Sequence, residues 1–163
     1  MKTKHNIYTG AAQQMSKVSD NSVELVVTSP PYPMIEMWDE IFGAQNPDTV
    51  VALQENRADV AFELMHAELD RVWDEVARVL VPGGIACINI GDATRTINGN
   101  FALYSNHSRI ISHFISHGFV NLPNIIWRKQ TNAPNKFMGS GMLPAGAYVT
   151  LEHEWILIFR KGG

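Results

Sequence analysis

Five residues, Thr28-Ser29-Pro30-Pro31-Tyr32, follow the apolar run Val23 to Val27 and combine a hydroxyl, a carbonyl and an aromatic ring. Pro30 and Pro31 lack a backbone N–H and have a fixed φ, and each keeps the residue before it extended. The carbonyl of Pro30 is therefore free to face a ligand. Together with Ser29 Oγ and the ring of Tyr32, it can hold a flat molecule that carries an exocyclic NH2 group.

Such a pocket fits the chemistry of a nucleobase amine. This amine is a poor nucleophile because its lone pair is delocalised into the ring, and an ordinary side-chain base cannot deprotonate it first. If Ser29 Oγ and the Pro30 carbonyl each accept one amino hydrogen, the nitrogen becomes more tetrahedral and its lone pair turns toward an electrophile. Stacking on Tyr32 is worth about 1–3 kcal/mol, which roughly offsets the few kcal/mol needed to pull a base out of duplex DNA.

At this motif the chain resembles the amino-group DNA methyltransferases, which carry Asp, Asn or Ser, then Pro-Pro, then an aromatic residue after the fourth strand of their sheet. The form Ser29-Pro30-Pro31-Tyr32 resembles the version found most often in enzymes that methylate cytosine at N4. Adenine-N6 enzymes mostly have Asp in the Ser29 position. The resemblance implies an S-adenosylmethionine-dependent enzyme that acts on a flipped DNA base, with these four residues as its catalytic residues.

The resemblance extends over most of the chain, in a permuted order that places the catalytic region before the cofactor-binding region. The segments that look like recurring family segments are Val81-Pro82-Gly83-Gly84 with the strand after it, His117-Gly118-Phe119, Ile126-Trp127-Arg128-Lys129 and His153 to Lys161. The resemblance therefore implies that the chain is the catalytic half of such an enzyme.

One family segment is missing, the glycine-rich turn of the form Phe-x-Gly-x-Gly on which cofactor binding depends. Gly83-Gly84 precedes its strand, Gly139-Ser140-Gly141 follows no strand, and Gly91 stands alone. In the permuted order the turn would come after Gly163. Many family members also have Asp after the glycine of the N-terminal segment, whereas this chain has Gly10-Ala11, so no cofactor-binding residue is assigned.

We therefore expect residues 1–163 to form a single domain that is half of a methyltransferase fold. It is either a fragment or a natural split subunit, and the missing C-terminal half or a complementing polypeptide brings the glycine-rich turn. The sheet edge left open beside the parallel strands would be a template for pairing with that partner. Alone, the chain should bind S-adenosylmethionine weakly or not at all.

Composition agrees with one core and argues against binding nucleic acid by bulk charge. The chain has 163 residues, of which 45% are hydrophobic, and its 13 Lys plus Arg against 16 Asp plus Glu give a formal net charge of −3. A local basic strip can still contact DNA. We expect this strip to comprise Arg128-Lys129, Lys136 and Arg160-Lys161 in the C-terminal third.

Several classes of protein are disfavoured. The single cysteine, Cys87, excludes a disulfide scaffold and lies in an apolar run, where an inert thiol is expected. Glu152-His153-Glu154 lacks the second histidine that a zinc hydrolase needs, so no metal is expected. Residues 1–6 lead into no secretory signal, and no apolar stretch approaches the ~20 residues that cross a bilayer. We expect a cytoplasmic, nucleoid-associated protein with no membrane partner.

The remaining pattern alternates strands with helices. The expected elements are an extended start and weak helical stretch at 7–18, a turn at 20–22, a strand at 23–27, short helical pieces at 33–57, an amphipathic helix at 58–80, a turn at 82–84, a strand at 85–90, a helix at 105–117, and strands at 124–128 and 148–160. The strand at 23–27 is almost wholly apolar, which is typical of a strand covered on both faces. This order predicts an α/β fold, a partial Rossmann-like sheet that is mostly parallel, with an antiparallel strand near one edge and helices on both faces.

Five further residues are candidates for substrate binding: Asp92, Trp38, Arg128, Lys129 and Lys136. Asp92 ends a predicted parallel strand, where ligand sites of open α/β sheets lie, but it can equally cap the following turn. Trp38 can cover a flipped base or pack on the domain. Lys136 lies in the loop 130–147, which is long enough to have a function of its own.

Competing functions remain open at this point. Adenine N6 is the nearest alternative to cytosine N4. Methylation of a protein glutamine uses a similar Asn-Pro-Pro-Tyr pocket, but there the cofactor half normally precedes the motif. A non-catalytic remnant that binds DNA or another protein is favoured by the absent glycine turn and disfavoured by the intact motif at Ser29 to Tyr32.

Overall fold

The computed structural model describes residues 2–129 and 151–162, and its longest element is the helix α3 (Ala58–Val79). Apolar residues recur along it every three or four positions, so Ala61, Met65 and Trp73 form one buried stripe. The helix ends where Leu80 becomes extended. The predicted amphipathic helix is confirmed.

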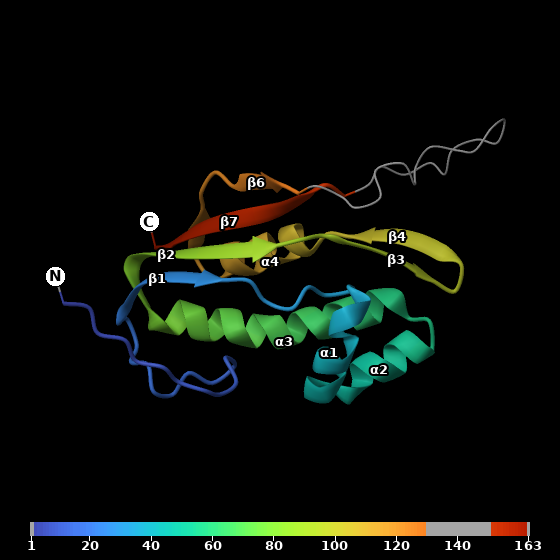
Figure 1. Cartoon of the computed structure of the whole chain (residues 1–163), viewed down its shortest axis with the longest axis horizontal. Coiled ribbons are helices and arrows are strands. Elements are labelled where there is room, and N and C mark those ends of the chain that lie inside the picture. Colours follow the sequence, from blue (N-terminus) through green and yellow to red (C-terminus); the bar gives the residue numbers. More distant parts are fainter. Residues whose placement is uncertain (1, 130–150, 163) are drawn as a thin grey trace.

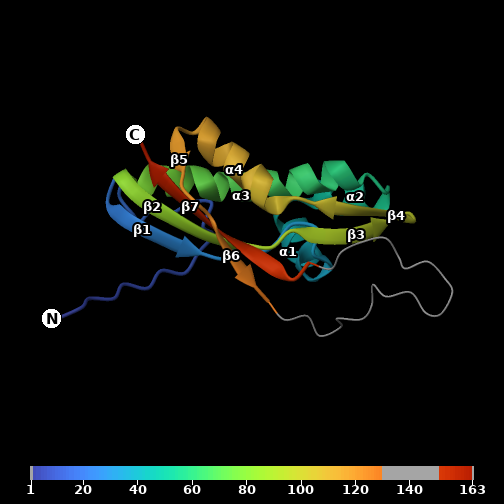
Figure 2. The same cartoon turned by 90° about the horizontal axis from the view of Figure 1, so that it is seen from above.

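The main sheet contains five strands, drawn in Figures 1 and 2. They are β1 (Val23–Thr28), β2 (Leu80–Ile90), β5 (Phe119–Asn121), β6 (Ile125–Arg128) and β7 (His153–Lys161). β1 pairs with β2 in parallel, and β7 is antiparallel to β2, β5 and β6. Four strands therefore point the same way and one opposes them, which confirms the predicted mostly parallel sheet with an antiparallel strand near one edge.

One face of this sheet, the covered face, is completely dry. Its central residues are Ala86, Ile88, Leu157 and Phe159, all 0% exposed. α4 (Asn106–Ser116) lies over it and stacks Phe114 on Phe159, with ring centroids 4.2 Å apart. α3 packs beside α4 on the same side of the sheet (Figure 2).

The opposite face, the open face, carries Leu25 and Val27 of β1, Cys87 of β2, Ile158 of β7 and Ile125 of β6. The register pairs Val27 with Cys87 and Cys87 with Ile158, so these side chains point the same way. Leu25 is 55% exposed, Val27 73% and Ile125 51%. The described helices thus cover one face, whereas the sequence predicted helices on both faces and a buried first strand.

The segments between the strands also contain short helices and a hairpin. The predicted helical pieces are confirmed as η1 (Glu36–Trp38), α1 (Asp39–Gln45) and α2 (Pro47–Gln54). A hairpin of β3 (Ala93–Ile97) and β4 (Asn100–Tyr104) was not predicted, although its Asn98-Gly99 turn, with φ of +50° and +74°, is a strong hairpin signal. α4 follows, close to its predicted bounds.

Two local predictions are wrong. Residues 7–18 contain no helix or strand; Arg78 and Glu75 of α3 instead hold this segment through the backbone of Met15 and Val18. Residues 82–84 do not form a separate turn, because β2 runs through them from Leu80 and absorbs them as an irregularity in its pairing with β1.

No helix in the described part of the chain is long and apolar enough to cross a membrane. The predicted loop 130–147 and the first residues of the predicted last strand, 148–150, lie outside the described residues.

Candidate active site

The strand β1 delivers the Ser-Pro-Pro-Tyr motif to the end of the sheet. Ser29 is exposed, and Pro30, Pro31 and Tyr32 are half-buried. The ring of Tyr32 lies against Gly91, just beyond β2, where an added Cβ would come within 3.0 Å of Tyr32 Cε2. Glycine at this position therefore allows the ring to rest on the end of β2.

The hydroxyl of Tyr32 is held by side chains from two neighbouring strands. It lies 2.7 Å from Nδ2 of Asn89 on β2 and 3.0 Å from Oε2 of Glu154 on β7. Asn89 Nδ2 also donates to Glu154 Oε2 at 2.7 Å, and Lys129 forms an ion pair with the same carboxylate. Asn89 and Glu154 point to the open face, so this network lies at the end of that face.

The donors and acceptors of this network determine where the proton of Ser29 points. Glu154 is an acceptor, so Tyr32 donates its hydroxyl hydrogen to Glu154 and accepts one from Asn89. Ser29 Oγ lies 3.3 Å from the Tyr32 hydroxyl and must then be the donor of that weaker contact. The lone pairs of Ser29 Oγ remain available to accept a hydrogen from a substrate amine.

The network also shifts the ionisation of its members. Burial raises the pKa of Tyr32, and the neighbouring charge of Glu154 adds to this effect. For Glu154, burial alone would raise the pKa, but hydrogen bonds from Lys129, Asn89 and Tyr32 outweigh burial and lower it. A neutral phenol and an ionised carboxylate are therefore the stable pair at neutral pH.

A cleft of about 340 Å³ opens beside the motif. Ser29, Pro30 and Pro31 form one wall, the N-terminal segment from Gly10 to Gln13 another, and Trp73 with other apolar residues the floor. Among the described residues no hydrogen bond to the Pro30 carbonyl is formed. Both residues that carry the predicted acceptors, Ser29 and Pro30, thus line an accessible cavity, and Ser29 Oγ and the Pro30 carbonyl have capacity to bind a donor.

A buried amide fixes the loop that follows the motif. Asn106, at the start of α4, donates to the carbonyl of Pro33 at 3.0 Å and to that of Gly91 at 2.9 Å. Both amide hydrogens are used, so its Oδ1 accepts from Nε2 of His66 at 3.0 Å. Met34 adopts a left-handed φ of +66°, a strained conformation for this residue type. The hydrogen bonds from Asn106 therefore hold the loop after the motif in one conformation.

The predicted substrate residues take different positions. Asp92 is almost buried, and its carboxylate accepts from the backbone N and from Nδ1 of His107 at the start of α4, not from the segment that directly follows it. Trp38 packs partly buried against the core. Lys129 reaches the Tyr32 network through Glu154, whereas Arg128 is 86% exposed and lies 3.7 Å from Glu152. Lys136 is outside the described residues.

The predicted basic strip does not come together in the described residues. Arg128 pairs with His153 at one end of β7, while Arg160-Lys161 lies at the other end. His153 and Arg160 are seven positions apart along this extended strand, which corresponds to roughly 23 Å. Lys161 instead binds the Leu80 carbonyl and Asn21.

Sequence reasoning missed Asn89, Glu154 and Asn106. The first two are ordinary polar residues on apolar strands, and only the pairing of β2 with β7 brings them together. One signal was available, because a polar residue inside an otherwise apolar strand needs a partner. Nothing in the sequence indicated which partner that would be.

A comparison with models of known protein families identifies the family of this chain. The model of the N6/N4 DNA methylases, described as "DNA methylase", matches residues 23–163. This chain belongs to the DNA methylase family. The match begins at β1 and includes the whole Ser-Pro-Pro-Tyr motif and the three strands that support it.

Two curated relatives are more than half identical to this DNA methylase chain. Type II methyltransferase M.MjaI of Methanocaldococcus jannaschii is 57% identical over 98% of this chain and 56% of its own length. Type II methyltransferase M.MthZI of Methanothermobacter thermautotrophicus is 56% identical over 100% of this chain and 46% of its own length. The chain thus spans about half the length of these relatives.

A solved structure shows the same fold. A candidate DNA modification methylase from Thermus thermophilus, complexed with S-adenosyl-L-methionine, is 35% identical, with a TM-score of 0.68. The similarity covers 94% of this chain and 54% of the other chain. Here too the DNA methylase chain corresponds to about half of its neighbour.

Proposed function

We propose that this chain supplies the base-binding and catalytic half of an S-adenosylmethionine-dependent DNA methyltransferase. Its target is the exocyclic amine of a flipped base, cytosine N4 first and adenine N6 as the alternative. The observation that supports this most directly is that Ser29 and Pro30, whose Oγ and carbonyl have capacity to accept a hydrogen, line a cleft at the end of β1, next to Tyr32 in the chain.

In the proposed site the base amine donates one hydrogen to Ser29 Oγ and the other to the Pro30 carbonyl. The two acceptors orient the nitrogen lone pair, which is positioning plus electrostatic stabilisation of the charge that develops on nitrogen. Tyr32 stacks on the base, and its fixed hydroxyl prevents the ring from rotating away. After transfer the nitrogen loses one proton, and the exposure of Ser29 gives that proton a route to solvent.

The described residues fit the methyl donor only in part. The cleft has an apolar floor and its lining contains no acidic side chain. An acidic side chain often binds the ribose hydroxyls of a nucleoside cofactor, and the glycine-rich turn of the family is absent from the sequence. No step of the reaction is therefore assigned to a cofactor contact of this chain.

We propose that the missing contacts come from a complementing segment that corresponds to the rest of the relatives. Within the described residues β1 pairs only with β2, so its other edge offers unpaired N–H and C=O groups. Beside that edge lie the exposed side chains of Leu25 and Val27 on the open face. A parallel strand added to β1, with a helix over the open face, would bury both and bring its own strand end next to Ser29.

Reconstitution tests the proposal. The chain is coexpressed with the part of M.MjaI that the match leaves out, and complex formation is measured by gel filtration. Plasmid DNA is then incubated with the complex and S-adenosylmethionine, digested to nucleosides and analysed by mass spectrometry. We expect N4-methylcytosine, and we expect Ser29→Ala to reduce it at least tenfold with little change in DNA affinity. Ser112→Ala, at an exposed serine of α4, is the matched control.

Different results of these experiments test different parts of the proposal. N6-methyladenine instead of N4-methylcytosine would assign the alternative base. Undiminished methylation by Ser29→Ala would remove Ser29 from the mechanism. A stable complex that modifies no DNA would contradict the catalytic role and favour a binding module. Micromolar affinity of the chain alone for S-adenosylmethionine, measured by calorimetry, would contradict the division of the site between two segments.

A further inference from the structure

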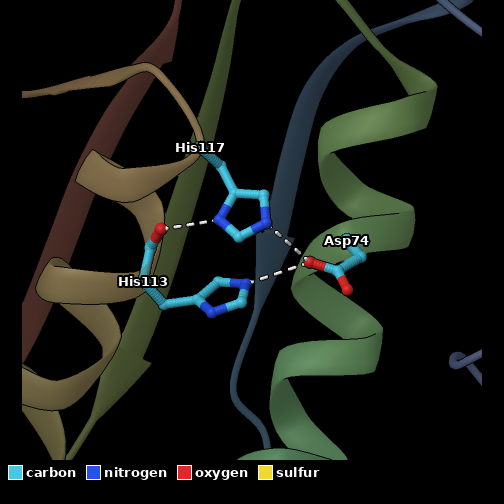
Figure 3. A group of neighbouring side chains, drawn as sticks. All are labelled: Asp74, His113 and His117. Atoms are coloured by element: carbon cyan, nitrogen blue, oxygen red, sulfur yellow. Dashed lines mark hydrogen bonds and ion pairs between the residues drawn. The ribbon is translucent and has the colours of Figure 1, made fainter.

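A second cluster of chemically capable side chains lies away from the Ser-Pro-Pro-Tyr motif, between α3 and α4. It consists of Asp74 on α3 and of His113 and His117 at the end of α4, shown in Figure 3. The two histidines are four residues apart, so they lie on the same side of the helix end. Their rings are stacked with centroids 4.2 Å apart, and both face Asp74.

Nε2 of each ring converges on the same carboxylate oxygen. Asp74 Oδ1 lies 3.0 Å from His113 Nε2 and 3.2 Å from His117 Nε2. Ligand atoms at about 2.0–2.1 Å around a tetrahedral zinc ion are about 3.3 Å from one another. The two distances to Asp74 Oδ1 are thus close to what such an ion requires, and all three donor atoms lie within 4.8 Å of one another.

The other nitrogen of each ring is already occupied. His113 Nδ1 lies 3.1 Å from Asp70 Oδ1, and Asp70 is in turn held by Arg109 at 2.7 Å. His117 Nδ1 lies 2.9 Å from the carbonyl oxygen of His113. A carboxylate or backbone carbonyl on the far nitrogen is the arrangement that orients metal-binding histidines and fixes their tautomer. It leaves Nε2 of both rings facing Asp74 Oδ1, and an ion bound among these three atoms would take the place of the hydrogens between them.

We propose that Asp74, His113 and His117 bind a divalent transition metal ion of the zinc type. Two imidazoles and one carboxylate suit zinc, and the exposure of the Asp74 and His117 side chains, 55% and 42%, leaves room for water as the fourth ligand. This proposal differs from the sequence-based expectation of no metal, which found the histidines scattered and no second histidine one helical turn from His153.

The ion ties the end of α4 to α3 and takes no part in methyl transfer. His113 lies seven residues after Asn106, the residue of α4 that holds the loop after the motif. Seven residues correspond to about 10 Å along a helix. Arg109 and His113 of α4 already pair with Asp70 of α3 near this end. A metal bridge at this end would therefore stabilise the helix pair on the covered face.

Cobalt and zinc titrations of the full chain test the site. Co²⁺ should give the visible absorption of a tetrahedral N, O site with one ion per chain. Zn²⁺ should displace it and raise the thermal midpoint by about 5–10 °C at a hundredfold excess over its dissociation constant. His117→Ala and Asp74→Asn change exposed side chains, so both variants should fold and each should lose at least tenfold in affinity. His5→Ala, at an exposed histidine of the N-terminal segment, is the control and should change nothing.

Two results would overturn the proposal. One is the absence of a cobalt spectrum and of any zinc-dependent shift, which would show that the cluster is only a set of ion pairs. The other is equal affinity in His117→Ala, Asp74→Asn and the unchanged chain, which would place bound metal elsewhere. Neither readout depends on methylation, so the outcome is independent of the function proposed above.

Discussion

The two faces of the main sheet differ in how far this chain alone can bury them. On the covered face Ile88, Leu157 and Phe159 are 0% exposed beneath α3 and α4. On the open face, to which the alternate residues of the strands point, Leu25 and Val27 are more than half exposed. Both faces are apolar, so the sequence pattern treats them alike. The difference shows that the described part of the chain has helices for one face only.

The catalytic candidates lie at the boundary between these two environments. The Tyr32 network belongs to the open face, whereas His66 and Asn106, which fix the loop behind it, are fully buried on the covered side. The covered side therefore supports the loop that carries Tyr32, and side chains of the open face, Asn89 and Glu154, hold the Tyr32 hydroxyl. If this division is correct, substitutions on the two sides should have different effects.

The largest effect is expected inside the covered face. Phe114→Ala removes the ring that stacks on Phe159 and lies 5.7 Å from Trp73. Loss of a fully buried phenylalanine typically costs about 3–5 kcal/mol of unfolding free energy. Urea unfolding should show this decrease, while the neighbouring Ile115→Ala, at a position 54% exposed, should cost less than about 1 kcal/mol. Equal costs at the two positions would refute the assignment of a dry face.

Lowering the pH should test how much the buried His66 contributes to the stability of the covered side. Burial lowers the pKa of His66 from 6.5 to about 3, so the folded chain keeps this ring neutral where the unfolded chain protonates it. Its Nε2–H donates to Asn106, and Nδ1 is buried without a partner among the described residues. Stability should therefore decrease as pH falls from about 6.5 toward 3, by up to about 1.4 kcal/mol per pH unit.

The variant His66→Gln isolates this contribution. Glutamine keeps a donor for Asn106 but does not titrate, so its unfolding free energy should depend less steeply on pH between 6.5 and 3 than that of the unchanged chain. Parallel pH profiles of the two proteins would show that His66 is not the group responsible. The carboxylates of the chain contribute equally to both profiles and cancel in the difference.

A smaller effect is expected at the boundary, from Glu154→Gln. The glutamine amide can donate to the Tyr32 hydroxyl, so the direction of the Tyr32 and Ser29 hydrogen bonds is no longer fixed. Removal of the charge should lower the pKa of Tyr32, because both the hydrogen bond to Glu154 and its charge raise that pKa. Ultraviolet titration, with Tyr32→Phe to assign the signal, measures this shift. In the reconstituted enzyme kcat should fall about tenfold, or about 1.4 kcal/mol, with KM little changed. An unaltered Tyr32 titration would contradict the network.

Local patterns predicted most of the helices and strands, because each depends on periodicity over a short window. The helix Ala58–Val79, the helix Asn106–Ser116 and the strand Val23–Thr28 followed directly from their spacing. The failures concern what packs against what. Leu25 and Val27 look like buried strand residues, but no periodicity indicates whether a helix is available to cover them.

In the candidate site, too, residues that are consecutive in the sequence could be predicted, and residues far apart in the sequence could not. Ser29 to Tyr32 could be identified because the chemistry resides in consecutive residues. Asn89 and Glu154 are 65 residues apart, and His113 and Asp74 are 39 apart, so only the tertiary structure brings them together. The His113 to His117 spacing was visible in the sequence, but a metal site also needed the carboxylate on α3.

The smallest effect on the chain alone, and the sharpest test of the open face, is expected for Val27→Asp. At 73% exposure the valine buries little surface, so its replacement should change the unfolding free energy of the isolated chain by about 0.5 kcal/mol or less. With the complementing segment present the same aspartate would lie under the added helix, where an unpaired charge is costly. Complex formation should then weaken at least tenfold. Ile115→Asp, on the outside of α4, should leave the complex unchanged, and equal binding by both variants would show that the segment does not cover this face.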